Sequence, residues 1–167
     1  KNDSDVNLIY VRDVVEQFKN CVNGDDYEFK TTKVKVSEVA EQLYYYKDVY
    51  FNEGKIPNLN NDFDRNLFNT FITYLDDDVR LLDTELHEDD RGSLTELLRC
   101  DSSEGQLFFS STNPNYVRGQ HFHMSKFERF CVIEGKAKIK MRKMGDKNVK
   151  EYNVSGDDIK VFDTPVM

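Results

Sequence analysis

The spacing of apolar residues changes near residue 83, and this change constrains the fold of the chain more than any other feature. Before it, apolar residues recur every three or four positions, as on one face of a helix. After it, they alternate with polar residues in short runs that turn residues separate. The pattern predicts an α+β chain that is mostly β, with helices first and antiparallel strands after them.

Three helices are expected in the first part of the chain. The apolar positions predict helices over residues 12–22 and 37–51 and a third that begins at Asp62, with a short strand over 33–36. Asn23-Gly24 should end the first helix, and Ser37 should cap the second. The aromatic stripes of the second and third helices are expected to pack in a core, because such stripes chiefly supply burial.

Six short strands are expected in the second part. Their predicted ranges are 94–99, 106–112, 130–134, 136–141, 150–154 and 160–162. Many short strands with turns at regular intervals are typical of an antiparallel sandwich or barrel. In 136–141, three lysines alternate with apolar residues, so the lysine row should be the solvated face of a half-buried strand.

The composition excludes several classes of function. Lys and Arg number 23 against 31 Asp and Glu, a net charge of −8, so we expect neither a nucleic-acid partner nor a polybasic membrane anchor. No apolar run approaches the ~20 residues of a membrane helix, and the N-terminus has no apolar signal-peptide segment. The three cysteines, an odd and sparse number, predict reduced thiols in a cytoplasmic protein.

The segment RGQHFHMSKFERFCVIEG, residues 118–135, carries the best signal for chemistry. His121 and His123 are two residues apart, so on a strand they would point to the same face, within reach of one metal ion. Glu128 could add a carboxylate from the next strand, and Gly135 permits the turn after it. These ligand types suit zinc, iron, manganese or nickel; we expect a divalent metal, with zinc first. The alternative is a pair of structural or surface histidines.

The pattern H-x-H-x4-E-x6-G resembles the first motif of the cupins, β jelly rolls that bind a metal or a substrate inside the barrel. Its usual upstream glycine is not at its usual distance, since Gly119 lies just before the histidines. Gly156 and Pro165 resemble the start of the second cupin motif, but the histidine of that motif does not follow before Met167. The resemblance implies a jelly roll that is incomplete at its C-terminal end.

Two further motifs resemble those of the dTDP-4-keto-6-deoxyhexose 3,5-epimerases, which are themselves cupins. The residues that match D-x-R-G-x-F-x-E are Asp89, Arg91, Gly92 and Glu96, with Leu94 in place of the aromatic residue. The residues that match R-G-x-H-[FY]-Q are Arg118, Gly119, His121 and Phe122, with His123 in place of the glutamine. In that family the arginine and glutamate of the first motif contact the nucleotide, and the histidine is the base.

This resemblance implies that Arg91 and Glu96 bind the nucleotide part of a substrate. The alternative for these two residues is a turn with a cross-strand ion pair. Arg118 could clamp the diphosphate with its planar guanidinium. Tyr116 is a possible proton donor, although packing is its more ordinary role, and Lys126 could neutralise an enolate.

His121 cannot be both a metal ligand and a base, because a metal would occupy its lone pair. A bound metal could polarise the keto oxygen as a Lewis acid. A free imidazole could instead abstract the proton next to the ketone. The presence of His123 where the epimerases have glutamine favours the ligand role.

The earlier part of the chain extends the resemblance. Residues 7–18, NLIYVRDVVEQF, resemble a late segment of the extended short-chain dehydrogenase/reductases. Residues 56–75, followed by the epimerase-like motifs, look like the capsular polysaccharide bifunctional enzymes, which join a reductase domain to a C-terminal cupin. The resemblance implies a reductase segment over 1–80 and a cupin over 81–167. Because the chain starts at Lys1 and stops soon after a proline, we expect it to be part of a longer protein.

The bifunctional enzymes act on UDP-4-keto-6-deoxy-N-acetylhexosamines, in the pathway to UDP-N-acetyl-L-fucosamine. The resemblance implies that the cupin epimerises the carbon next to the ketone before an NADPH-dependent reduction. This chain lacks the glycine fingerprint of dinucleotide-binding folds and a Tyr-x-x-x-Lys pair, so NADPH is expected only in a complete enzyme.

Two other classes of function stay open at this stage. The first is a non-catalytic module that binds a UDP-sugar or a metal. The second is an iron-dependent cupin oxygenase, against which the D-x-R-G motif argues. A homodimer is expected by analogy with other cupin barrels.

Overall fold

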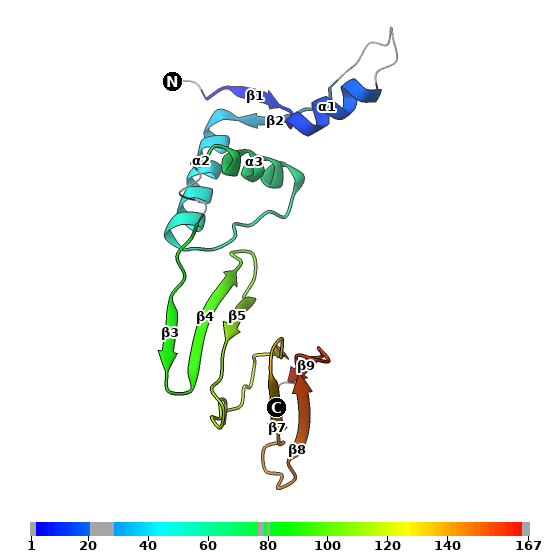
Figure 1. Ribbon diagram of the computed structural model, residues 1–167. Helices are drawn as coiled ribbons and strands as arrows, with labels where there is room; N and C mark the ends of the chain where they lie inside the picture. The colour runs from blue at the N-terminus through cyan, green and yellow to red at the C-terminus, as the bar shows by residue number, and fades with distance from the viewer. Residues whose placement is uncertain (1–2, 21–28, 77–78, 80, 165–167) are drawn as a thin grey trace. The chain divides into compact units, whose positions relative to one another are not determined.

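The computed structural model describes residues 3–20, 29–76, 79 and 81–164 (Figure 1). Contacts divide the chain into two compact units, Lys1–Tyr116 and Val117–Met167. The predicted domain boundary between residues 80 and 81 falls inside the first unit. The predicted boundary separates two segments that resemble different families, whereas the two units are defined by contacts. The contacts therefore do not test the boundary, and it stays a prediction.

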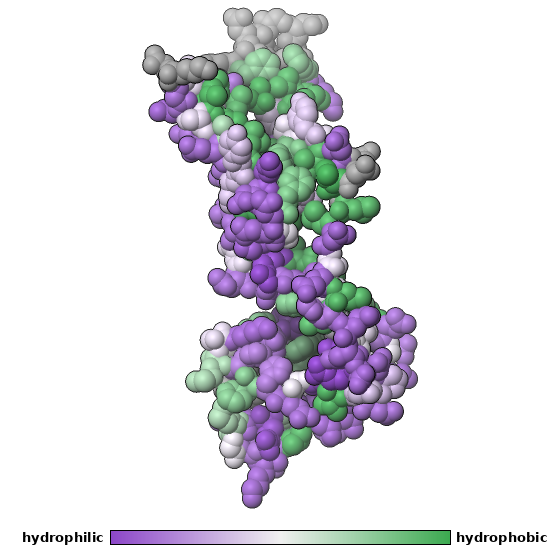
Figure 2. All heavy atoms as spheres, turned by 90° about the vertical axis from the view of Figure 1, so that its left-hand side faces the viewer, coloured by the Kyte–Doolittle hydropathy of each residue, from purple (hydrophilic) through white to green (hydrophobic). Residues whose placement is uncertain are grey.

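The first unit opens with a small sheet and a helix. Strand β1 (Asp5–Leu8) pairs antiparallel with β2 (Thr32–Lys35), and α1 (Val11–Asn20) lies between them in sequence. The helix starts one residue before its predicted start, and its predicted end at Asn23-Gly24 lies outside the described residues. Its apolar residues are largely exposed, and Figure 2 shows hydrophobic side chains at the surface of the N-terminal part of the chain.

Helix α2 (Val36–Lys47) continues into a short π-helical segment, η1 (Asp48–Asn52). The prediction that Ser37 caps this helix is wrong, because Ser37 already lies in its first turn and its side chain donates to Asp3. The Asp3 carboxylate accepts from the Ser37 amide at 3.0 Å and from its hydroxyl at 2.6 Å. These hydrogen bonds lower the pKa of Asp3. Asp3 thus satisfies a free amide of the helix terminus from a distant part of the chain.

Helix α3 (Asp62–Thr73) begins at the predicted residue, and the Asn61 side chain accepts from the Asp64 amide as its cap. The core of the first unit lies where α3 meets α2 and η1. Tyr46 is fully buried and Phe68 is 8% exposed, with their rings 5.2 Å apart. The aromatic core was expected, but Phe68 lies outside the stripe that the spacing predicts.

A three-stranded antiparallel sheet follows, formed by β3 (Leu86–Asp89), β4 (Gly92–Arg99) and β5 (Gln106–Ser110). The second and third of these strands agree with the prediction to within two residues. The first was missed, because Leu86 is its only large apolar residue and alternation cannot be recognised in it. Among described residues of the sheet, Thr95 is the one classed as buried.

The second unit is built from two strand pairs that together make one long, bent hairpin. Strand β6 (Glu128–Cys131) pairs with β9 (Val161–Thr164), and β7 (Lys136–Met141) pairs with β8 (Lys150–Ser155). Strand β6 leads directly into β7, and β8 leads directly into β9. One arm of the hairpin therefore consists of β6 and β7, and the other arm consists of β8 and β9. The strand predicted at 130–134 begins earlier, at Glu128, and the other three lie within two residues of their predicted positions.

Two glycines form the bend of this hairpin. The Gly156 amide donates to the Gly135 carbonyl at 2.9 Å, and Gly135 has a φ of +73°. A Cβ atom on Gly156 would lie 2.6 Å from the Ile133 carbonyl oxygen and 2.7 Å from the Glu134 Cα. The bend therefore requires glycine at position 156 for lack of space, and glycine at 135 suits its left-handed backbone.

The expected class, helices followed by mostly antiparallel strands, is confirmed. The lysine row of β7 is exposed, as expected, while Ile139 and Met141 on the other face are partly covered. Within the part of the chain that the structure describes, no helix has the length and apolar character needed to cross a bilayer.

We predict that Gly156→Ala weakens the bent hairpin, since its new methyl group would press against backbone atoms that cannot rotate away. A cost of about 1–3 kcal/mol is typical of such overpacking. Hydrogen–deuterium exchange of the amides in 128–141 should accelerate accordingly. Gly105→Ala is the matched control, because its Cβ would meet only the Ser103 hydroxyl at 3.4 Å. Equal protection in the two variants would contradict the prediction.

We also predict that Phe68→Ala destabilises the first unit by about 3–5 kcal/mol, the usual cost of removing a buried phenylalanine ring. Urea unfolding followed by circular dichroism would measure the change. Tyr44→Ala serves as the control, because Tyr44 is 73% exposed on α2 and its loss should cost less than about 0.5 kcal/mol. Similar losses in both variants would show that the aromatic cluster is not the core.

Candidate metal centre and neighbouring motifs

The two histidines of the motif lie in a loop. Residues 111–127 contain no strand, so the prediction that His121 and His123 share a strand face is wrong. Gly119 and Gln120, just before them, have φ values of +97° and +61°, which are incompatible with an extended strand. The loop nevertheless brings the two imidazoles together, with ring centroids 4.8 Å apart.

Glu128 completes a cluster with the two histidines. One potential ligand atom from each of His121, His123 and Glu128 lies within 4.8 Å of the others. Ligand bonds of about 2.0–2.2 Å place the ligands of one metal ion roughly 3–4 Å apart. Small side-chain adjustments would therefore bring all three around a single divalent ion. The sequence spacing predicted this set of three residues, although the backbone that presents the histidines differs.

The His123 ring has a buried nitrogen that supports this fit. Its Nε2 atom lies 3.3 Å from Glu128 Oε1, within the distance of an ion pair, but it makes no hydrogen bond. A buried polar atom without a hydrogen bond is costly. A metal ion between Nε2 and the carboxylate would satisfy both, so these residues fit a divalent metal.

The charge of Glu128 depends on its neighbours. Partial burial raises the pKa of this carboxyl group, but the hydrogen bond from Lys126 and the charges of Lys126 and the two histidines lower it by more. The net effect is a lowered pKa, so Glu128 is ionised at neutral pH, as a metal ligand must be. Lys126 Nζ lies 2.9 Å from Glu128 Oε1, a contact that the sequence analysis did not predict.

The remaining residues predicted for this site are not part of the cluster. Arg118 is half-buried in the same loop, three residues before His121. Tyr116 ends the first unit, is 48% exposed, and donates its amide to the Asn113 carbonyl in a turn. Lys126 forms an ion pair with Glu128, whereas its predicted role was to neutralise an enolate, a role that stays a prediction.

The first epimerase-like motif forms a tight turn between β3 and β4. The Asp89 carboxylate accepts from the Arg91 amide at 2.8 Å and from its Nε at 2.9 Å. The hydrogen bond to Asp89 raises the pKa of Arg91. Gly92 has a φ of +128°, and a Cβ there would lie 2.4 Å from the Ser111 carbonyl oxygen. Each of these residues thus has a structural role in the turn.

Glu96 lies further along β4 and pairs with Arg99, which donates to both carboxylate oxygens at 2.8 and 2.7 Å. Arg91 and Glu96 therefore have separate ionic partners. The turn expected under the alternative interpretation is present. The ion pairs, however, join residues close in the chain, and none of them joins Arg91 to Glu96. The substrate-binding role of these residues stays a prediction.

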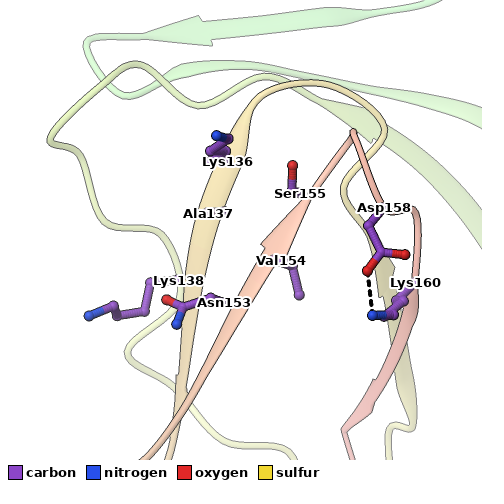
Figure 3. A pocket seen from close by; sticks show the side chains of 8 residues that line it. All are labelled: Lys136, Ala137, Lys138, Asn153, Val154, Ser155, Asp158 and Lys160. Atoms are coloured by element: carbon purple, nitrogen blue, oxygen red, sulfur yellow. Dashed lines mark hydrogen bonds and ion pairs between the residues drawn. The ribbon is translucent and has the colours of Figure 1, made fainter.

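A groove of about 470 Å³ lies on the β7–β8 hairpin, where Ala137 and Val154 stand opposite each other (Figure 3). Three lysines line it, and each has an acidic partner. Lys138 is 3.0 Å from Glu151, Lys136 is 3.9 Å from Asp157, and Lys160 pairs with Asp158. Its positive charge is largely compensated, so the groove has little intrinsic attraction for a phosphate group.

Comparison with known proteins gives these features a family context. Residues 87–167 match the model of the polysaccharide biosynthesis C-terminal domain. The chain is 30% identical over 170 residues to a UDP-2-acetamido-2,6-beta-L-arabino-hexul-4-ose reductase of Pseudomonas aeruginosa, covering 96% of this chain and 44% of the relative.

Solved structures of CapF have the same fold as this chain. The capsular polysaccharide assembling protein CapF from Staphylococcus aureus matches 99% of this chain with a TM-score of 0.88 at 31% identity. CapF with the inhibitor 3-isopropenyl-tropolone matches with a TM-score of 0.87 at 31% identity. The chain covers 46% and 50% of these two proteins, so it spans about half the length of its relatives. Residues 87–167 therefore match the polysaccharide biosynthesis C-terminal domain, and nearly the whole chain is similar to part of a UDP-sugar reductase and to part of CapF.

Proposed function

We propose that this chain is part of an enzyme that modifies a UDP-linked sugar for capsular polysaccharide, and that its C-terminal part is a metal-binding cupin that epimerises the carbon next to a ketone. The cluster of His121, His123 and Glu128 carries the proposal. The relatives support it, because one is a reductase of a UDP-linked hexulose and another assembles capsular polysaccharide. The proposed substrate is a UDP-4-keto-6-deoxy-N-acetylhexosamine.

Epimerisation next to a ketone requires removal of a proton, stabilisation of the enolate and return of a proton on the other face. A divalent ion such as zinc, held by His121, His123 and Glu128, would supply Lewis-acid stabilisation of negative charge on the keto oxygen. The CapF inhibitor agrees with this role, since a tropolone carries adjacent carbonyl and hydroxyl oxygens of the kind that chelate divalent ions.

Other residues of the chain would hold the substrate. Arg118, three residues before His121 in the same loop, is the candidate for the diphosphate, because its planar guanidinium suits phosphate oxygens. Arg91 and Glu96 are the candidates for the nucleotide, although each would have to bind it together with its present ionic partner. Tyr116 is the candidate proton donor. If His121 is not a ligand, its imidazole is the candidate base.

Reduction of the epimerised ketone by NADPH would need a dinucleotide-binding segment beyond this chain. We place the complete enzyme in the cytoplasm, where sugar nucleotides and reduced thiols coexist, and we expect it to work as a homodimer.

We predict that the chain exchanges the proton next to the ketone with solvent. The chain would be incubated in D2O with a UDP-4-keto-6-deoxy-N-acetylhexosamine and without NADPH, and the proton followed by NMR. His121→Ala should slow exchange by at least roughly 10–100-fold, the cost in activity seen even for the loss of an outer-shell partner of a metal ligand. His87→Ala is the control, because His87 is exposed on β3 and lies outside the cluster. Substrate binding without any exchange would instead indicate a binding module.

We predict that the full chain binds one Zn²⁺ or Co²⁺ ion at the cluster. His123→Ala and Glu128→Ala should each weaken binding by at least roughly 10–100-fold, the range seen even for the loss of an outer-shell partner. Isothermal titration calorimetry would measure the affinity, with His87→Ala as the control that leaves it unchanged. Unchanged affinity in the cluster variants would refute the metal site.

A further inference from the structure

Two cationic or potentially cationic side chains meet at one oxygen of Glu128. Lys126 Nζ lies 2.9 Å from Glu128 Oε1, and His123 Nε2 lies 3.3 Å from the same atom. The Glu128 side chain is 20% exposed, whereas that of Lys126 is 55% exposed. The lysine therefore approaches a mostly covered carboxylate from the solvent side.

The oxygen that faces His123 is the one that would bind a metal shared with that histidine. A divalent ion bound by Glu128 Oε1 and His123 Nε2 would lie about 2.0–2.2 Å from each of them. Lys126 Nζ, at its present position, would then be close to the ion, and two positive charges at such short range repel each other. The lysine and the metal cannot both interact with Oε1 as closely as each does alone.

We propose that Lys126 competes with the metal ion for Glu128 and so lowers the metal affinity of the cluster. The inference rests on the metal site proposed above and adds a determinant of its strength. Binding of an ion would require Lys126 to leave Oε1, and its flexible stem would let the ammonium group move into solvent. Without an ion, Lys126 stays beside Oε1 and balances the charge of the carboxylate.

The opposite role for Lys126 would be that of an outer-shell residue that orients Glu128 and strengthens metal binding. Such a partner holds the part of a ligand that the metal leaves free. Lys126 instead contacts Oε1, the oxygen directed at His123. Competition is therefore the role that the geometry favours.

The test is the affinity of the full chain for Co²⁺, measured by isothermal titration calorimetry for the wild type and Lys126→Met. Methionine keeps most of the length of the stem and removes the charge. We expect Lys126→Met to bind about threefold to fivefold more tightly, the upper part of the range for a partly exposed ion pair. The visible absorption spectrum of bound Co²⁺ should not change, because the three ligands remain.

Two variants separate competition from general effects of charge or structure. Lys126→Arg keeps the positive charge beside Glu128 and should bind Co²⁺ within about twofold of the wild type. Lys160→Met removes the ion pair to Asp158 in the same unit and should also leave the affinity unchanged. Lys160 precedes Val161, which pairs with Cys131 at the end of β6 opposite to Glu128.

The outcomes distinguish this inference from the metal site itself. Equal or weaker Co²⁺ binding by Lys126→Met, with wild-type binding that His123→Ala abolishes, would overturn the competition and leave the site intact. If Lys160→Met also bound Co²⁺ more tightly, the change in affinity would come from net charge alone. That result would overturn the inference as well. Failure of the wild type to bind Co²⁺ would refute the metal site and the competition together.

Discussion

The second unit depends on one close approach of backbone to backbone. Gly156 lies so near Ile133 and Glu134 that no side chain fits there, and its amide donates to the Gly135 carbonyl. This contact bends the hairpin while both of its ladders keep their register. Strand β6 starts at Glu128, opposite Thr164, so the register of the bent hairpin fixes the position of the carboxylate. The candidate metal centre therefore rests on a regular strand at one ligand and on an irregular loop at the other two.

This difference between the strand and the loop explains which parts of the site could be predicted from the sequence. The spacing of His121, His123 and Glu128 predicted a cluster of three, and the three residues do come together. The prediction that a strand presents the two histidines was wrong, because the left-handed backbone at Gly119 and Gln120 replaces the expected strand. Glycine there could signal a turn, but nothing in a single sequence signals a positive φ at a glutamine. Alternation detects strands, whereas loop geometry depends on local backbone angles that apolar spacing does not encode.

The fold shows the same contrast between pattern and context. Helices with periodic apolar residues and strands with clear alternation were predicted to within a few residues. The strand at Leu86–Asp89 was missed because Leu86 is its only large apolar residue, so its pairing with β4 is what makes it a strand. Ser37 was predicted as a cap from its residue type, but its hydroxyl donates to Asp3, which lies 34 residues earlier. The first error comes from pairing with a neighbouring strand, Leu86 with Thr95 and Asp89 with Gly92, and the second from a contact between residues far apart in the chain. Neither interaction can be recognised from the spacing of apolar residues.

The residues that match a family motif are not all equally strong evidence of function. Gly92 and Asp89 are explained by the turn they form, and Arg91 is held by Asp89 within it. A pattern that a tight turn requires would persist without a bound nucleotide, so this motif alone says little about substrate. The cluster differs, because no local structure needs two imidazoles beside an ionised carboxylate, and His123 Nε2 is buried without a hydrogen bond. The polar groups that the fold leaves unsatisfied are therefore better evidence of function than the motif that the fold itself explains.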